Sequence, residues 1–260
     1  MVATLRSVLG RLNLVLFGAA ILSATFLLTD TIANRQPSVR RLDAAAAHRR
    51  RMASPRQARV YFLIIDSLRY ETATDPSIMP NLCALAREGV RARVMPGFNA
   101  VTGPAIRDAF TGRENASVLA FVANFLQVDA GVESIFNQMA SEGIASATYS
   151  MGFFRQFGNS VTYQTDIPSR SSRDSDEANV LKGVELLRGG RADFVVGHLN
   201  YTDYAAHDYG IHRPEYRAAF GRADALIATI RSRLPPGTTF AVAGDHGHDE
   251  QGRHTYGLNV

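Results

Sequence analysis

Carboxylates and histidines gather in the second half of this chain in a pattern that could bind metal ions. Six of the seven histidines follow residue 197, and three of them fall within the stretch "GDHGHDEQGRH". Asp203 and His207 are four residues apart, which places them on one face if the segment between them forms a helical turn. Mixed carboxylate and imidazole ligands suit divalent ions such as zinc. A single histidine is more often structural, but the joint pattern predicts metal-ion chemistry.

Three stretches of apolar residues must position these groups. Asp66 ends the run "RVYFLII", Asp203 lies just beyond "ADFVVGHLN", and Asp245 with His246 ends "TTFAVAGD". Such runs are typical of strands buried on both faces. Helical patterns separate them, and alternating strands and helices predict an α/β domain whose mainly parallel sheet carries helices on both faces. Because ligands bind beyond the carboxyl ends of such strands, we expect these side chains to meet at one edge of the sheet.

The rest of the chain after residue 79 reads as further strands and helices. A polar loop is expected around residues 168–177. Helices are expected over residues 80–89, 104–110, 117–126, 131–143, 178–190 and 214–234, with further strands at residues 90–97 and 145–150.

Length and composition favour one large domain. At 260 residues with 46% hydrophobic and 20% charged side chains, the chain can bury an ample core. Cys83 is the single cysteine, so an intrachain disulfide and a thiolate metal cluster are both excluded. Any metal site must therefore use histidine and carboxylate ligands, and the folded domain is expected to span residues 58–260.

The amino-terminal part differs from the rest in charge and hydropathy. Residues 1–60 hold ten arginines against two aspartates, whereas the remainder holds 18 basic and 22 acidic residues. A slightly acidic folded part argues against a nucleic-acid partner. Residues 12–28 carry no charge, so residues 1–33 are expected to form a signal anchor or a cleaved signal peptide, followed by a basic linker over residues 34–57. The protein is thus expected to be membrane-anchored or exported, with an extracytoplasmic catalytic domain, periplasmic in a bacterium.

Five motifs taken in order resemble those of the alkaline phosphatase superfamily. They are "IIDSLR", "PNLCALAREG", "TGPAIRDAFTG", "DYAAHDYG" and "GDHGHDEQGRH", and together they cover about residues 58–258. They look most like the type I phosphodiesterase and nucleotide pyrophosphatase branch and the related glycolipid (GPI-type) ethanolamine-phosphate transferases; sulfatases share this fold. The resemblance implies phosphoryl transfer on a phosphodiester, with a phospholipid or glycolipid as a possible substrate. Family members generally continue beyond the position of His254, so the domain is expected to be truncated or minimal.

The resemblance also implies a catalytic metal site. By that likeness the first of two divalent ions, expected to be zinc, would be bound by Asp66, Asp245 and His246, and Thr102 would be the nucleophile at the same ion. A phosphothreonine would form and then react with water or with an acceptor alcohol. A second interpretation is that Thr102 caps the helix expected from Pro104, a role compatible with the first.

The second implied ion would be bound by Asp203, His207 and His254. Asn124 and His212 are weaker candidates for contacts with the substrate, and His248 has no assigned role. A sulfatase is less expected, because that branch needs a cysteine or serine where this chain has Thr102. The alternative from a different class is a catalytically inactive or incomplete membrane-anchored domain that binds metal; no protein partner can be inferred.

Overall fold

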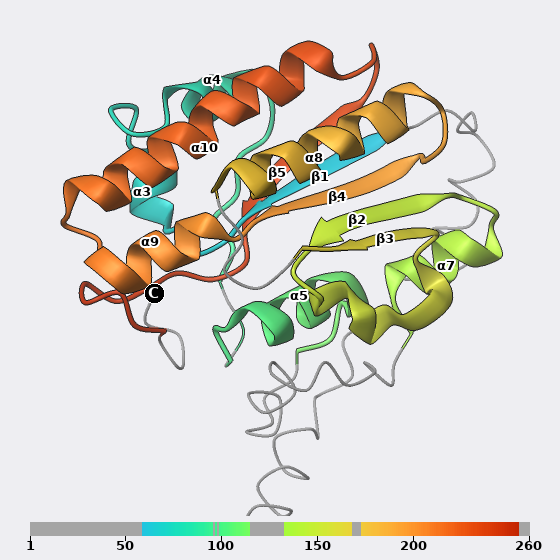
Figure 1. Cartoon of the computed structure of the whole chain (residues 1–260), viewed down its shortest axis with the longest axis horizontal. Coiled ribbons are helices and arrows are strands. Elements are labelled where there is room, and N and C mark those ends of the chain that lie inside the picture. Colours follow the sequence, from blue (N-terminus) through green and yellow to red (C-terminus); the bar gives the residue numbers. More distant parts are fainter. Residues whose placement is uncertain (1–58, 96, 98, 115–132, 168–172, 255–260) are drawn as a thin grey trace, which may run out of the picture.

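A single parallel sheet organises the protein. The computed structural model describes residues 59–95, 97, 99–114, 133–167 and 173–254. Five strands pair in the order β3-β2-β4-β1-β5, and every pairing is parallel (Figure 1). The strands are β1 (Val60–Ile65), β2 (Ser146–Ser150), β3 (Tyr163–Asp166), β4 (Phe194–Leu199) and β5 (Thr239–Gly244).

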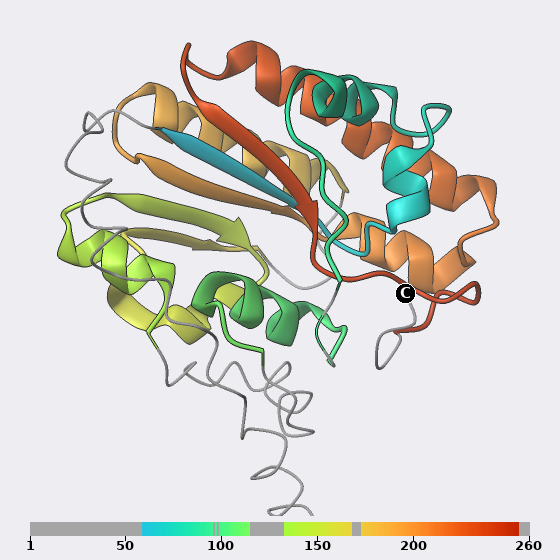
Figure 2. The ribbon, with the colours of Figure 1, turned by 180° about the vertical axis from the view of Figure 1, so that it is seen from behind.

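Helices cover both faces of this sheet, as Figures 1 and 2 show from opposite sides. One face carries α4 (Pro80–Glu88), α8 (Arg173–Arg188) and α10 (Pro214–Arg233). The other carries α5 (Thr102–Thr111), α7 (Ile135–Ser141) and the 3-10 helix η1 (Phe153–Ser160). Two shorter helices, α3 (Tyr70–Thr74) and α9 (Tyr201–Tyr209), lie beyond the carboxyl ends of the strands. The predicted α/β class with a parallel sheet is confirmed.

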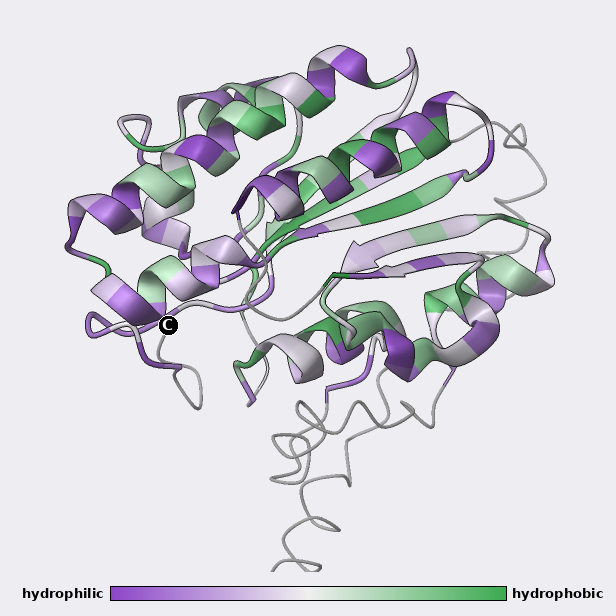
Figure 3. Cartoon of the chain, viewed as in Figure 1, coloured by the Kyte–Doolittle hydropathy of each residue, from purple (hydrophilic) through white to green (hydrophobic). Residues whose placement is uncertain are grey.

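The central strands are apolar on both faces because each face has its own core. Tyr61, Leu63 and Ile65 of β1 pack into the cluster formed with α8 and α10. Ile64 faces the opposite way, into a cluster rich in phenylalanine that α5, α7 and η1 complete. Alternate residues of one strand therefore enter different cores, which explains the nearly unbroken apolar runs and the hydrophobic strands in Figure 3.

Most of the predicted elements are present, but the strand expected at residues 90–97 is wrong over its described residues. Residues 90–95 form no strand, and Val90 and Val94 are 97% and 73% exposed. The alternation of apolar and basic residues suits a strand, yet a strand exists only where neighbouring backbone supplies hydrogen bonds. Two other predictions, the helix at residues 117–126 and the segments within residues 1–58, lie outside the described residues. In the described part, no helix is long and apolar enough to cross a membrane.

Helix α8 begins within the predicted polar loop and fixes the start of α9. It begins at Arg173, and its buried Asp176 accepts hydrogen bonds from the backbone N–H groups of Asn200 (2.8 Å) and Tyr201 (3.0 Å). These N–H groups lie at the amino end of α9, where no preceding turn can satisfy them. Asp176 therefore anchors the helix that carries Asp203 and His207.

Candidate metal centre

The first group of candidate ligands comes from two neighbouring strands. Ile65 and Gly244 are paired in the parallel register of β1 and β5, so Asp66 and Asp245 leave the sheet side by side. His246 Nε2 lies 3.2 Å from Asp66 Oδ1 and 3.5 Å from Asp245 Oδ2. Ligand atoms of all three residues lie within 4.8 Å of one another, and their side chains are buried. The sheet therefore builds the three-residue group that sequence reasoning expected at its carboxyl edge.

Thr102 is the first residue of α5 and faces this group. Its Oγ1 lies 3.2 Å from His246 Nε2 and 3.5 Å from Asp66 Oδ2. The N-cap position of α5 belongs to Val101, with no capping bond from a side chain, so the interpretation of Thr102 as the cap of this helix is wrong. The hydroxyl is thus directed to the ligand group, at a helix amino terminus whose dipole favours an anionic substrate.

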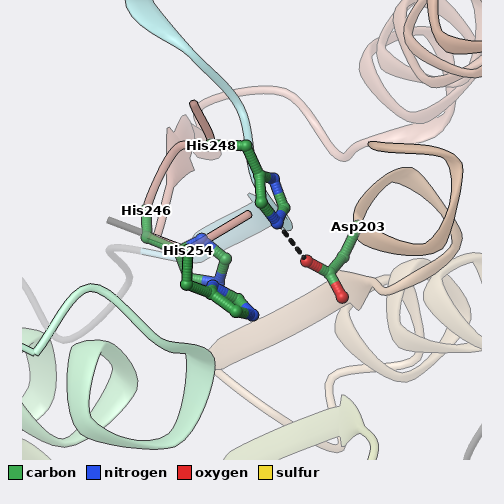
Figure 4. A group of neighbouring side chains, drawn as sticks. All are labelled: Asp203, His246, His248 and His254. Atoms are coloured by element: carbon green, nitrogen blue, oxygen red, sulfur yellow. Dashed lines mark ion pairs between the residues drawn. The ribbon is translucent and has the colours of Figure 1, made fainter. Parts of the chain in front are cut away.

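The second group is built from α9 and from the loop that follows β5 (Figure 4). Asp203, His246, His248 and His254 place ligand atoms within 4.8 Å of one another, with His248 Nε2 3.3 Å from Asp203 Oδ1. A backbone bridge between His248 and His254 folds the loop back and brings these two side chains together. His248, which has no role assigned from the sequence, is therefore a member of the group.

His207 lies at the rim of this second group. Its Nε2 is 3.1 Å from His254 Nε2, 3.3 Å from His248 Nε2 and 3.5 Å from Asp203 Oδ1. Asp203 and His207 are one turn apart in α9, as their spacing predicts for a helix. The structure thus brings together Asp203, His207 and His254 as expected from the sequence and adds His248 beside them.

Ser67 links the two groups; it lies in the motif "IIDSLR", but the sequence analysis assigned it no role. The residue is buried and adopts a left-handed conformation with φ of 62°, which is uncommon for a residue other than glycine. Its hydroxyl donates to Asp203 Oδ1 at 2.7 Å, and its backbone N–H donates to Asp245 Oδ1 at 3.1 Å. One residue therefore holds a carboxylate of each group. Strained backbone of this kind is concentrated at functional sites.

Crowding of buried carboxylates dominates the electrostatics of the site. Burial and the negative charge of Asp66 raise the pKa of Asp203 to about 7 and that of Asp245 to about 6. Burial favours a neutral His246, but Asp245 and Asp66 raise its pKa to about 10. Burial also opposes ionisation of Asp66, yet contacts with His198 and His246 lower its pKa. A buried cluster of mutually repelling carboxylates is stabilised by cations.

Two histidines of the second group, His248 and His254, are held neutral. Burial and the positive charge of His246 lower the pKa of His248 well below its usual range and that of His254 to about 4. Neutral imidazole is the form that binds metal ions. Two buried atoms, Asp245 Oδ2 and His248 Nδ1, have no hydrogen-bond partner among the described residues. The donor set of carboxylates and neutral imidazoles therefore fits divalent metal ions.

Of the two weaker candidates, His212 is among the described residues and is not a member of either ligand group. The side chain of His212 is 72% exposed, and its Nε2 lies 3.9 Å from Glu250 Oε2. Asn124 lies outside the described residues.

Solved structures with a similar fold include two phosphoester or phosphonate enzymes. Murine ectonucleotide pyrophosphatase / phosphodiesterase 5, solved as an inactive variant with AMP, matches with a TM-score of 0.61 and 18% identity, over 75% of this chain and 59% of that one. Phosphonoacetate hydrolase from Sinorhizobium meliloti, solved with phosphonoformate, matches with a TM-score of 0.56 and 17% identity, over 76% and 59%. At these identities the likeness shows the fold.

Sequence comparison adds relatives and a family. The catalytic subunit of GPI ethanolamine phosphate transferase 3 is 35% identical over 68 residues in Mus musculus, or 26% of this chain and 6% of that protein. The human protein is 31% identical over 90 residues, or 34% and 8%. The chain thus spans less than a tenth of these relatives. The family model described as type I phosphodiesterase / nucleotide pyrophosphatase matches residues 120–258, more than half of the sequence. The chain belongs to the type I phosphodiesterase / nucleotide pyrophosphatase family.

Proposed function

We propose that this protein is a metal-dependent phosphoryl-transfer enzyme that acts on phosphodiesters through Thr102. The observation that carries the proposal is the position of the Thr102 hydroxyl, at the amino end of α5 and within 3.5 Å of both Asp66 and His246. A nucleophile beside carboxylate and imidazole ligands is what two-metal phosphoryl transfer requires. Family membership supports the reaction class.

Two divalent ions, which we expect to be zinc, would be held by the two ligand groups. Asp66, Asp245 and His246 would hold the first, with Thr102 beside it. The second would be held by Asp203, His207 and His254, with His248 as a further ligand from the same cluster. When bound, such ions neutralise the phosphate oxygens and favour the ionised threonine hydroxyl.

The side chains of this chain have distinct tasks in the proposed reaction. Thr102 Oγ1, having lost its proton, attacks phosphorus, and the bond to the leaving alcohol breaks as the phosphothreonine forms, still esterified to the other alcohol of the substrate. The leaving oxygen takes up a proton and departs as the alcohol. The amino terminus of α5 orients the substrate through its backbone N–H groups. Ser67 and His246 keep the carboxylates of Asp203 and Asp66 in place while charge moves between the attacking and leaving oxygens. Water or an acceptor alcohol then releases the phosphoryl group from Thr102.

The substrate and its surroundings are part of the proposal. The short matches to GPI ethanolamine phosphate transferase 3 favour a phospholipid or glycolipid phosphodiester, and a transferase that uses an alcohol acceptor. A membrane-anchored or exported protein would meet such lipids. Its residues 1–33 would be a signal anchor or signal peptide, residues 34–57 a linker and residues 58–260 the catalytic domain.

A metal-exchange experiment tests this function. The purified full-length chain is stripped with a chelator, reloaded with zinc and assayed with bis-p-nitrophenyl phosphate. We expect two ions per chain and hydrolysis that the chelator abolishes and zinc restores. Metal binding without turnover of this or a lipid phosphodiester would instead indicate the inactive metal-binding domain. Release of a labelled headgroup to water, compared with its transfer to an added alcohol, separates hydrolase from transferase.

A further inference from the structure

We propose that His198 and Ser150 form a positioning pair that holds Asp66 in the orientation the metal site needs. This inference rests on the proposed function, because Asp66 is a ligand only if the site binds metal. His198 Nε2 lies 3.2 Å from Asp66 Oδ2, and His198 Nδ1 lies 2.8 Å from Ser150 Oγ. Both side chains of the pair are buried.

The sheet explains why these three side chains are in line. His198 is paired with Ile64 in the register of β4 with β1, and Thr148 is paired with Val196 in the register of β2 with β4. Paired residues lie on the same face of a sheet, and so do residues two apart along one strand, because side chains alternate. Asp66 is two residues after Ile64, and Ser150 is two residues after Thr148. Asp66, His198 and Ser150 therefore share one face. This is the face covered by α5, which carries Thr102. The row of polar groups therefore runs across three neighbouring strands and ends at the candidate ligand.

The proton on the His198 ring can be assigned from its two neighbours. A ring nitrogen that faces a carboxylate must carry a hydrogen, because otherwise two sets of lone pairs would repel each other. Nε2 therefore donates toward Asp66, and Ser150 either donates to a neutral Nδ1 or accepts from a protonated one. Among the described residues, no acceptor is aligned well enough for a regular hydrogen bond with His198 Nε2. The N–H is therefore attracted electrostatically to the Asp66 carboxylate, 3.2 Å away.

This arrangement restrains the orientation of the Asp66 carboxylate through one of its oxygens. Oδ2 lies near both His198 and Thr102, whereas Oδ1 faces His246. Outer partners that restrain a ligand in this way typically contribute about 10–100-fold to metal affinity or activity. A histidine that served only to fill the core would need no polar neighbours, and an apolar residue of similar volume would replace it. His198 instead connects Ser150 to Asp66.

Two substitutions of His198 test this role in the full-length chain. Zinc affinity is measured by competition with a chromogenic chelator, and the melting temperature of the metal-free protein is measured beside it. We expect His198→Leu to weaken zinc binding at the group of Asp66, Asp245 and His246 about 10–100-fold. His198→Gln, which keeps an N–H near the position of Nε2, should recover most of that loss. If His198→Leu binds zinc like the unchanged protein, or if glutamine gives no rescue, the role is overturned.

Two matched variants of β2 control for a general loss of stability. Ser150→Ala should weaken zinc binding by a smaller factor, about tenfold, because only the ring orientation is affected. Thr148→Val is the control, since Thr148 lies two residues earlier on the same face and its buried hydroxyl makes no hydrogen bond to any residue that the structure describes. Equal zinc affinities for the two variants would overturn the pair. If the unchanged chain binds no zinc, the proposed function itself fails, and this role fails with it.

Discussion

The two ligand groups are built from different kinds of structure. Asp66, Asp245 and His246 follow adjacent strands of the sheet, and none of their side chains is more than 3% exposed. In the second group, Asp203 belongs to a helix, and His207 has a side chain that is 35% exposed. The first group is richer in carboxylate and the second in imidazole.

This difference has a physical consequence for how each group would hold an ion. Asp66 follows β1, which has ladders on both sides and cannot shift without disturbing the core, whereas Asp245 and His246 follow β5, which pairs with β1 at the edge of the sheet. The ladder between these two strands fixes the spacing of the first group. The second depends on the loop from residue 246 to residue 254 and on α9, whose amino end Asp176 anchors. We infer that the first group sets the position of the reacting phosphate, whereas the second adjusts to it and exchanges its ion more readily.

The largest expected effect comes from the proposed nucleophile, Thr102, which faces the first group. Thr102→Ala should lower kcat for a phosphodiester by about 10⁴-fold or more, because the covalent step is lost. Thr102→Ser should keep measurable activity. Zinc content, measured by atomic emission on the dialysed protein, should be unchanged in both variants. Activity of the alanine variant within tenfold of the unchanged enzyme would remove Thr102 from the proposed role.

Substitution of a ligand in each group compares the groups directly. Asp245→Asn should weaken zinc binding at the first group by more than about 100-fold, which exceeds the usual effect of a residue that only contacts a ligand. His254→Gln should weaken zinc binding at the second group alone, leaving one ion per chain. Calorimetric titration of the metal-free variants gives both stoichiometry and affinity. The contrast between the groups is wrong if His254→Gln releases both ions, or if Asp245→Asn releases neither.

Acidification should weaken zinc binding, because metal ions must displace protons from the ligands. Asp203 and Asp245, with pKa values of about 7 and 6, hold protons below these values, and the raised pKa of His246, about 10, means that its proton must also leave. Each displaced proton lowers the affinity about tenfold per pH unit, so affinity should fall by at least that factor between pH 7 and pH 6. Titrations in matched buffers check this slope, and an affinity that is constant over this range would contradict it.

The smallest expected effect separates His248 from His212. His248→Gln should weaken the second site by about tenfold, in keeping with one of several imidazoles in that group. His212→Gln is the matched control, because His212 is exposed and paired at 3.9 Å with Glu250. Zinc affinity and KM are measured for both. Equal behaviour of the two variants would show that His248 only occupies space beside the second group.

Much of the site was predictable because its ligands follow strands. Apolar runs predicted β1, β4 and β5, and parallel strands bring their carboxyl ends to one edge, which is enough to gather Asp66, Asp245 and His246. The helical spacing of Asp203 and His207 was equally informative. By contrast, the predicted strand over residues 90–95 is absent, because alternation cannot say whether a neighbouring backbone is present.

By itself the sequence determined the fold class, the ligand types and their order along the chain, since these depend on local hydrophobic periodicity and on residue chemistry. Tertiary structure alone decided that His248 joins the second group, that Ser67 links the two groups, and that His198 contacts Asp66. The reason is geometric. The direction of a side chain after a turn, and its neighbours across a sheet, follow from backbone dihedrals and strand register, and neither can be read from spacing along the chain.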